Sequence, residues 1–505
     1  MKVKSILLLR ADGNVEMGAG HLMRMLALAQ AWRAGGREAV FVCAEVPQSV
    51  TQRLNDEGFL VRKINGAPGS ADDLKASIAL TADYIGRNLI FVLDGYQFNA
   101  EFQRAVREVV YRLVVFDDYG HSAFYHADWV VNPNISATKL RYQRRSSKTH
   151  LLLGQRFIVL RREFVEHDPA KRKFPEVARN ILVTLGGSDP NNVTEEILGA
   201  LDGSDFHVKV VIGGSNPHLD RLRTFATRAN KGTTHFELMV NVRDMPSLML
   251  WADFAITAGG STVWEMAYFG LPSIIVVTAR NQVESVGAIS KAGFAHCITK
   301  FEELEKGDLR KVVEYLVKDK AHRERISVAG QAVVDGKGGY RLCEVLESDS
   351  LISLHPVDEV DFQLIWGWAN DHETRKNSFD SADIPWEAHV EWCLSKMRDP
   401  HCRFWLAKIA NHDNVACVRI DRLDEKPTIS IVVSGDERGN GYGRQIIRAA
   451  CLEVFSECKV DQVYALIKPG NLASVRSFEA VGFEFEGEVA YKSQPALCYV
   501  FRQKF

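Results

Sequence analysis

Short apolar runs alternate with longer amphipathic stretches at the start of the chain. The apolar runs lie at 3–9, 39–44, 89–94 and 112–118. Between them, residues 21–34 and 100–110 show helical periodicity, and the first of these stretches ends at Gly35-Gly36. Strands of this apolar kind, separated by helices, are typical of a parallel sheet covered on both faces. We therefore expect a Rossmann-like α/β domain over residues 1–150.

The same alternation begins again at residue 180. Its apolar runs lie at 180–189, 208–214, 254–262 and 271–277, with helices between them and a helical stretch over 308–347. This pattern predicts a second Rossmann-like domain over 151–347. Two such units in tandem would form a cleft at the carboxyl ends of their strands.

The pattern of hydrophobic and polar residues changes after a polar junction at 348–355. Two tryptophan-rich helical stretches, 362–369 and 387–397, precede antiparallel-looking strands. Those strands lie at 404–409, 415–419 and 428–434, and a long helix to about 458 and a strand at 463–467 follow them. We expect a third, α+β domain over 355–505, so the fold class is α/β in the first two domains and α+β in the third.

The composition limits the kinds of binding partner and the cellular compartment that we expect for this chain. Lys and Arg total 62 against 64 Asp and Glu, so no excess charge favours nucleic acid or an anionic membrane. The nine cysteines are odd in number and form no C-x-x-C pair, which is typical of reduced thiols in a cytoplasmic protein. The apolar run at 6–9 is too short for a signal peptide, and no run approaches the roughly 20 residues of a membrane helix.

Candidate chemistry begins with a glycine-rich turn after the first strand. The segment R-A-D-G-N-V-E-M-G-A-G-H, residues 10–21, leads into a helix through Gly18, Gly20 and His21. Glycines let a ligand approach the backbone closely, and the helix N-terminus favours the neutral, base-competent imidazole. His21 could equally be a helix cap. Asp94 ends a strand, where α/β sites gather, but it could also cap the next helix.

This segment, L-D-G-Y at 93–96 and the region 259–272 resemble the metal-independent UDP-sugar hydrolases of pseudaminic acid biosynthesis. Those enzymes share the GT-B fold of the MurG-type glycosyltransferases, and the resemblance covers about 1–345. It implies that His21 activates water for inverting attack at the anomeric carbon, which releases UDP. It places Asp12, Asp94 and Tyr96 near the sugar, and Asn281 near the leaving UDP.

The nucleotide half of the same resemblance lies in T-A-G-G-S-T-V-W-E, residues 257–265. The turn would offer donors to the diphosphate, and Glu265 would accept from the ribose hydroxyls. A second glycine turn at 185–188 would face the same cleft, and the segment 240–246 would frame uracil. The UDP-sugar-binding residues implied are Arg10, Gly20, Gly187, Ser188, Val242, Gly259, Gly260, Ser261, Thr262 and Glu265.

A further glycine turn, R-G-N-G-Y-G at 438–443, follows the strand at 428–434 and resembles the GNAT acyltransferases. Its N–H groups would bind the pyrophosphate of acetyl-CoA, the implied co-substrate. The spacing N-x-x-S and the later G-F at 482–483 agree with that family. The acetyl-CoA-binding residues implied are Val432, Val433, Arg438, Gly439, Asn440, Gly441, Gly443, Arg444, Asn471 and Ser474.

The sequence leaves more than one candidate for the general acid and for the general base of this domain. Many GNAT enzymes carry a tyrosine acid where this chain has Ser477-Phe478, so Tyr491 could serve, or the thiolate could leave without a dedicated acid. His389 could be a base, but its helix favours a packing role. Trp386 and Trp392 favour the core rather than a sugar platform.

The segments N-S-F-D-S-A-D-I at 377–384 and W-E-A-H-V-E-W at 386–392 resemble, more narrowly, the acetyltransferase of the same pathway. That enzyme acts on the 4-amino group of UDP-4-amino-4,6-dideoxy-N-acetyl-β-L-altrosamine, and its product is the substrate of the hydrolase. The sequence therefore predicts a bifunctional enzyme that acetylates and then hydrolyses a UDP-sugar, as a monomer or weak homo-oligomer. The alternatives are a glycosyltransferase that uses an acceptor hydroxyl, and a sensor that binds a nucleotide sugar without turnover.

Overall fold

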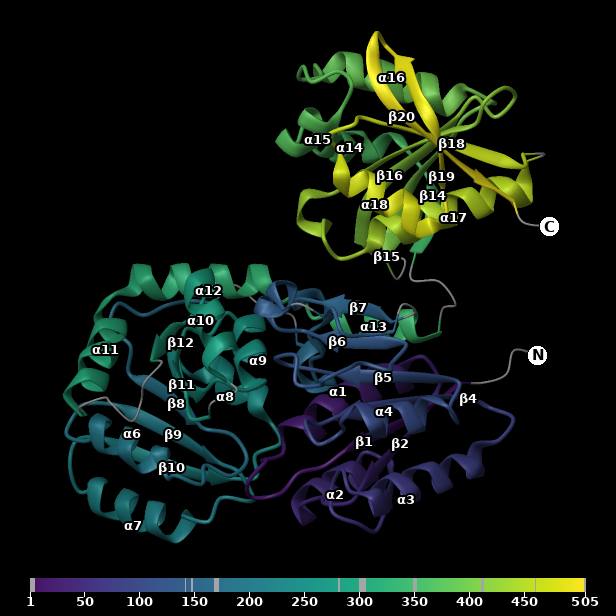
Figure 1. The fold of residues 1–505 in the computed structure, drawn as a ribbon. Coiled ribbons are helices and arrows are strands. Elements are labelled where there is room, and N and C mark those ends of the chain that lie inside the picture. The colour runs from purple at the N-terminus through teal and green to yellow at the C-terminus, as the bar shows by residue number, and fades with distance from the viewer. Residues whose placement is uncertain are drawn as a thin grey trace. The chain divides into compact units, whose positions relative to one another are not determined.

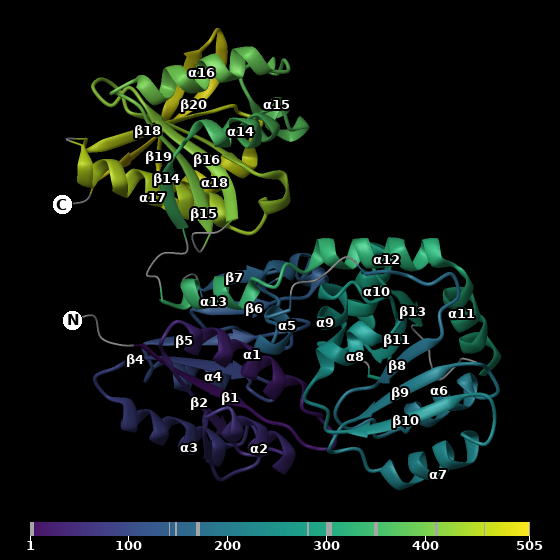
Figure 2. The ribbon, with the colours of Figure 1, turned by 180° about the vertical axis from the view of Figure 1, so that it is seen from behind.

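The structure is a computed structural model of the chain, and it describes residues 5–140, 142–146, 149–167, 172–279, 282–298, 306–347, 352–409, 413–458 and 460–503. The chain forms two compact units, Met1–Cys343 and Glu344–Phe505, which we describe separately. Figures 1 and 2 show their elements from opposite sides. No described helix has both the length and the hydropathy needed to cross a membrane.

The first sheet of the larger unit has seven parallel strands. Their order is β3 (Leu60–Lys63), β2 (Glu38–Cys43), β1 (Ser5–Ala11), β4 (Asn88–Asp94), β5 (Arg112–Phe116), β6 (Trp129–Asn132) and β7 (His150–Leu153). The helices are α1 (Gly20–Ala34), α2 (Gln48–Asp56), α3 (Ala71–Thr81), α4 (Ala100–Arg107) and α5 (Arg162–Val165). The central strands are buried along almost their whole length, as strands covered on both faces must be.

The second sheet of this unit has six parallel strands. Their order is β10 (His235–Val240), β9 (His207–Ile212), β8 (Asn180–Thr184), β11 (Phe254–Ala258), β12 (Ser273–Val276) and β13 (His296–Ile298). Its helices are α6 (Val193–Leu201), α7 (Leu219–Ala229), α8 (Met245–Trp251), α9 (Thr262–Tyr268), α10 (Val283–Ala292), α11 (Lys306–Lys318) and α12 (Lys320–Val333).

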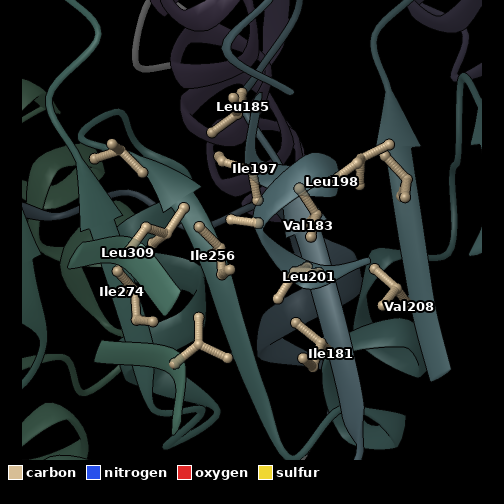
Figure 3. Packing of buried hydrophobic residues seen from close by; sticks show 14 of the residues in the cluster. Ile181, Val183, Leu185, Ile197, Leu198, Leu201, Val208, Ile256, Ile274 and Leu309 are labelled. Carbon is tan, nitrogen blue, oxygen red and sulfur yellow. The ribbon is translucent and has the colours of Figure 1, made fainter. Parts of the chain in front are cut away.

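The core of this sheet is aliphatic. Figure 3 shows Ile197, Leu198 and Leu201 of α6 packed against side chains of the strands, among them Val183 and Ile256. All five side chains are completely buried. Burial of this kind holds the strand ends, and the loops that follow them, in fixed positions.

The smaller unit is built on a mixed sheet of seven strands. Their order is β14 (Ile352–Pro356), β15 (Arg403–Ile409), β16 (Asp413–Asp421), β17 (Thr428–Val433), β18 (Gln462–Ile467), β20 (Gln494–Arg502) and β19 (Glu484–Tyr491). Only β17 and β18 run parallel; the other neighbours are antiparallel. The helices are α14 (Phe362–Ala369), α15 (His372–Asn377), α16 (Trp386–Arg398), α17 (Tyr442–Glu457) and α18 (Leu472–Val481), while α13 (Gly338–Glu347) spans the division between the units.

The predicted fold class is confirmed: two parallel α/β sheets precede a mixed α+β sheet. The helices at 21–34 and 362–369 are confirmed within one residue at each end. The polar junction at 348–355 is wrong in its second half, because Ile352–Pro356 forms β14 against β15. The short strands β6 and β7 and the hairpin of β19 and β20 were not predicted.

Candidate functional site

The candidate site of the larger unit begins with a histidine–carboxylate pair. His21 is the second residue of α1, and Asp94 is the last residue of β4. Ala11 pairs with Asp94 in the sheet, so the loop between β1 and α1 starts at the edge where Asp94 ends its strand. His21 Nδ1 lies 2.7 Å from Asp94 Oδ1. The His21 side chain is 13% exposed, while Asp94 is fully buried beneath it.

Arg24 joins this pair to a second carboxylate. It lies one turn after His21 on α1 and donates to Asp94 Oδ1 at 2.6 Å and to Asp94 Oδ2 at 2.9 Å. It also donates to Asp118 Oδ1 at 2.7 Å. Burial would raise the pKa of both carboxyl groups, but the charge and hydrogen bonds of Arg24 hold the pKa of each below its ordinary value. Both carboxylates are therefore ionised near neutral pH.

Tyr96 and Asn134 also bind Asp118, and with Arg24 and Asp118 they form a set of polar side chains that we call the polar floor. The Tyr96 hydroxyl donates to Asp118 Oδ2 at 2.9 Å, and Asn134 Nδ2 donates to Asp118 Oδ1 at 3.1 Å. The Tyr96 ring meets the His21 ring edge to face, with their centroids 5.1 Å apart. The Tyr96 ring thus contacts the imidazole, while the Asp94 carboxylate binds its Nδ1. This arrangement fixes the orientation of the His21 ring.

Arg10 and Asp12 lie at the end of β1 and directly after it. The two side chains pair at 2.7 Å, and Arg10 also pairs with Asp73 at 2.6 Å. Asp12 accepts from the backbone N–H groups of residues 44 and 45 and from Gln97. Arg10 is 0% exposed and Asp12 is 1% exposed. The guanidinium of Arg10 thus has two carboxylate partners inside the fold.

Two glycine loops meet in this unit. A side chain placed on Gly187 would come within 3.3 Å of the backbone nitrogen of Ala19, and one on Gly18 would come within 3.9 Å of Ser188 Oγ. Gly18 has a φ of +71°, which favours glycine, whereas Gly20 has open space beside it. The structure thus brings the predicted residues Gly20, Gly187 and Ser188 close to the start of α1. Ser188 is buried.

The predicted nucleotide residues follow β11. Gly259 is half-buried and donates to Gln282 Oε1 at 3.3 Å, while Gly260 and Ser261 are exposed and Thr262 begins α9. Val242 is half-buried against the apolar core of this sheet. Asn281, the residue expected near the leaving group, lies outside the described residues.

Glu265 carries an unexpected partner. Arg161 donates to Glu265 Oε1 at 2.9 Å, and both side chains are nine-tenths buried. Arg161 also pairs with Glu163 at 3.0 Å, which in turn pairs with Arg53 of α2. Burial raises the pKa of Glu265 despite the charge of Arg161. The carboxylate expected to bind ribose is thus held by an arginine from the segment between the two sheets.

The candidate cofactor site of the smaller unit is a gap between two parallel strands. β17 and β18 pair only at Thr428 with Tyr464 and at Ile429 with Ala465, and the half-buried Val432 and Val433 lie beyond that pairing. The turn after β17 holds Gly439 at a φ of +84° and Gly441 at +79°, immediately before α17. A splayed strand that leads into a glycine turn and a 16-residue helix presents free backbone N–H groups at one end of the gap.

The predicted side chains around this turn have partners of their own. Arg438 donates to Asp371 Oδ1 at 2.5 Å and to Thr374 Oγ1 at 2.8 Å, which ties the turn to the start of α15. Asn440 donates to Glu437, and Arg444 lies beside Gly441. Gly443 lies in ordinary contact distance of Val433 and of Ser477. Asn471 caps α18 by accepting from the backbone of Ser474 at 3.1 Å.

The open questions about this domain receive structural answers in part. His389 is 1% exposed and lies 3.1 Å from the carbonyl oxygen of Phe362, which favours the packing role. Phe478 is buried against Phe483, so the usual acid position holds an apolar ring. Tyr491 is half-buried with its ring against Phe379. Trp386 is 39% exposed and meets Trp366 edge to face, while Trp392 packs on Phe404.

Sequence reasoning missed Arg24, Asp118 and Asn134. The signal for Arg24 was its spacing from His21, because residues three apart share a helix face. Asp118 comes shortly after β5, at the same sheet edge as Asp94. Among the described residues, no three His, Cys, Asp or Glu side chains gather as ligands of a metal ion.

Two family models match the chain. Residues 180–336 match the glycosyltransferase family 28 C-terminal domain, and residues 352–484 match the acetyltransferase (GNAT) domain. The chain therefore joins a region similar to the first of these domains to a region similar to the second. The second parallel sheet lies within the first of these matches, and the mixed sheet lies largely within the second.

Similar proteins match longer parts of the chain than the two family models do. An uncharacterized protein of Methanocaldococcus jannaschii is 25% identical over 94% of this chain and 95% of its own length. The spore coat polysaccharide biosynthesis protein SpsG of Bacillus subtilis is 24% identical over 67% of this chain and 96% of its own. The UDP-2,4-diacetamido-2,4,6-trideoxy-β-L-altropyranose hydrolase of Campylobacter jejuni is 21% identical over 57% and 97%. A solved structure of AAC(6′)-Ib with acetyl-CoA covers 31% of this chain and 94% of its own, with 20% identity and a TM-score of 0.28.

Proposed function

We propose that the larger unit hydrolyses a UDP-linked 2,4-diacetamido-6-deoxy sugar with His21 as general base. The observation that carries the proposal is the 2.7 Å contact between His21 Nδ1 and the buried Asp94. A neutral imidazole that donates from Nδ1 keeps its lone pair on Nε2, where it can accept a proton. The distant similarity to the hydrolase of Campylobacter jejuni supports this choice of substrate.

The reaction follows from these positions. A water oxygen attacks the anomeric carbon as His21 Nε2 takes one of its protons, and the bond from the anomeric carbon to the phosphate oxygen breaks. UDP leaves with the electron pair of that bond, and the sugar inverts its configuration. Asp94 stabilises the imidazolium that forms, in the way that a buried carboxylate orients and stabilises a catalytic histidine.

The second sheet would hold the nucleotide. Residues 180–336 match the glycosyltransferase family 28 C-terminal domain, and Gly260 and Ser261 are exposed at the end of β11. Their donors suit a diphosphate, and Glu265 suits the ribose hydroxyls once they share its carboxylate with Arg161. Arg10 and Asp12, in our proposal, support the site from below rather than bind the substrate.

The smaller unit would acetylate the 4-amino group of the UDP-4-amino-6-deoxy sugar that precedes this substrate. When bound, acetyl-CoA supplies the activated acetyl group. Val432, Val433 and the turn from Gly439 to Gly443 would hold its pantetheine and pyrophosphate between β17 and α17. Because Phe478 fills the usual acid position, the leaving thiolate would be protonated by Tyr491 or by solvent.

Glycosyl transfer is the second candidate for the larger unit. The description of the matching family model favours it, since an acceptor hydroxyl could take the place of water. The two reactions differ in what they need. Hydrolysis releases UDP and a free sugar with no acceptor present, whereas transfer requires one.

The test uses the full chain with UDP-2,4-diacetamido-2,4,6-trideoxy-β-L-altropyranose and no acceptor. We expect stoichiometric UDP and free sugar from the wild type and none from His21→Ala. UDP binding by calorimetry and acetylation of the 4-amino precursor serve as controls, and His21→Ala should keep both. UDP release that depends strictly on an added acceptor would contradict hydrolysis, and weak UDP binding by His21→Ala would make His21 a phosphate ligand instead.

A further inference from the structure

We propose that Tyr119 is a stacking platform for the apolar face of the sugar in the UDP-sugar, and so determines specificity for sugars with methyl groups. This inference rests on the proposed hydrolase function. Tyr119 follows the Asp117-Asp118 pair at the end of β5 and is 40% exposed. An open aromatic ring beside a polar site can bind a ligand, because aromatic side chains are common in ligand sites.

The position of the ring points to the sugar. Its centroid lies 5.0 Å from that of Tyr96, and the Tyr96 centroid lies 5.1 Å from that of His21. Tyr96 thus contacts both the His21 ring and the exposed Tyr119 ring, and the His121 centroid lies 5.6 Å from that of Tyr96 and 6.1 Å from that of Tyr119. In our proposal, a sugar whose anomeric carbon faces His21 reaches Tyr119 across Tyr96.

The turn that carries Tyr119 is held rigidly. Asp117 accepts from the backbone of Gly120 at 2.7 Å and from that of His121 at 3.1 Å. Its carboxylate also lies 2.5 Å from His121 Nδ1 and accepts from the Tyr142 hydroxyl at 2.5 Å. Asp117 is fully buried, and Gly120 takes a φ of +78°. A platform that is already ordered loses little conformational entropy when it binds.

The surroundings of Tyr119 select the kind of sugar. Asp118, Tyr96 and Arg24 form a polar floor that can meet hydroxyl and amide groups. The Tyr119 ring, in contrast, offers an apolar surface, which suits C–H groups and methyl groups. A 6-deoxy sugar with acetamido groups has both kinds of surface, whereas a fully hydroxylated hexose would leave polar groups unpaired against the ring.

The experiment measures binding, so it does not depend on turnover. Tyr119→Ala and Tyr119→Phe are compared by calorimetry in the full chain carrying His21→Ala, which keeps the ligand intact. Tyr111→Ala is the matched control, because Tyr111 is 46% exposed and precedes the same strand at its other end. The probes are UDP, UDP-N-acetylglucosamine and UDP-2,4-diacetamido-2,4,6-trideoxy-β-L-altropyranose.

We expect Tyr119→Ala to weaken binding of the diacetamido sugar about tenfold, which corresponds to ~1.4 kcal/mol. UDP should bind all variants equally, UDP-N-acetylglucosamine should lose less, and Tyr119→Phe and Tyr111→Ala should match the parent. Equal weakening for UDP, or no change for the diacetamido sugar, would overturn the role of Tyr119. Absence of UDP release from the wild type would overturn hydrolysis but leave these binding ratios valid. If neither UDP-sugar binds the parent, both proposals fail.

Discussion

Asp94→Asn tests the proposed base most directly. The substitution keeps the shape of the side chain under His21 but removes its charge. The amide oxygen that replaces one carboxylate oxygen could still accept from His21 Nδ1, but the amide could also rotate and donate, which would hold the wrong tautomer of the ring. The substitution would also leave the imidazolium of the transition state without its carboxylate. We expect turnover to fall while UDP binding stays unchanged.

The size of the loss follows from the geometry. The contact is 2.7 Å long, and the carboxylate is fully buried, so solvent screens it little. A hydrogen bond to a charged group contributes about 1.5–3 kcal/mol, and the attraction of opposite charges about 4 Å apart adds about 4 kcal/mol at an effective dielectric constant of about 20. Part of this attraction is already offset in the ground state through Arg24. We therefore expect a loss of roughly 3–4 kcal/mol in the transition state, or about 10²–10³-fold in kcat.

The assay is UDP release at saturating UDP-sugar, with acetylation by the same preparation as a control for intact protein. Circular dichroism and urea unfolding check the fold, because Arg24 would keep only Asp118 as a charged partner and removing one partner of a buried pair can cost about 3–5 kcal/mol. A folded Asp94→Asn protein with kcat within about threefold of wild type, a factor worth less than about 1 kcal/mol, would refute the assignment of His21 as a base oriented by Asp94.

Three other predictions follow from the same structure. The fold lowers the pKa of Asp94 and of Asp117, so these carboxylates stabilise the folded state above about pH 4, the ordinary pKa of an aspartate. This contribution is lost as the pH falls through their pKa values in the folded state. The urea midpoint of the larger unit should therefore fall below about pH 4, and it should fall less steeply in Asp94→Asn. Glu265→Gln should weaken UDP binding about tenfold by calorimetry, since one charged hydrogen bond is worth about 1.5–3 kcal/mol, and leave acetylation unchanged; unaltered UDP affinity would remove Glu265 from the nucleotide site. Gly441→Val should abolish acetyl-CoA binding but not UDP release, because a β-branched residue is strained at a φ of +79°; retained acetyl-CoA binding would contradict the placement of the cofactor.

The fold could be predicted where an apolar run was long enough to show its period. β1 and β4 have seven residues each, nearly all buried, and both were found. β6 and β7 have four residues each and lie among polar turns, so periodicity could not separate them from loop. β14 was missed for another reason. Its buried Ile352 is followed by residues that are only partly buried, which reads as a polar junction.

The site could be predicted in part. His21 and Asp94 were predicted as site residues because His21 follows a recognisable strand and Asp94 ends one, but their contact could not be foreseen from positions 73 residues apart. Arg10 and Asp12 show the limit of the same reasoning. Arg10 lies in β1 and Asp12 follows that strand, and contacts with Asp73 and Gln97 from other parts of the chain enclose the two side chains. Only the tertiary contacts distinguish a polar group that lines a site from one that supports it.

The balance of charge around His21 explains why the site needs Asp118 as well as Asp94. The two carboxylates and the single guanidinium of Arg24 leave one net negative charge beside the His21 ring. In the proposed reaction, the proton that His21 takes from water cancels this charge, so proton transfer relieves charge instead of creating it. Asp118 acts on His21 through space and through Arg24, without contact, so Asp118→Asn should reduce kcat about tenfold, well short of Asp94→Asn, since charge effects fall with distance. Equal losses in the two variants would mean that Arg24 alone, rather than the Asp94 contact, governs the histidine.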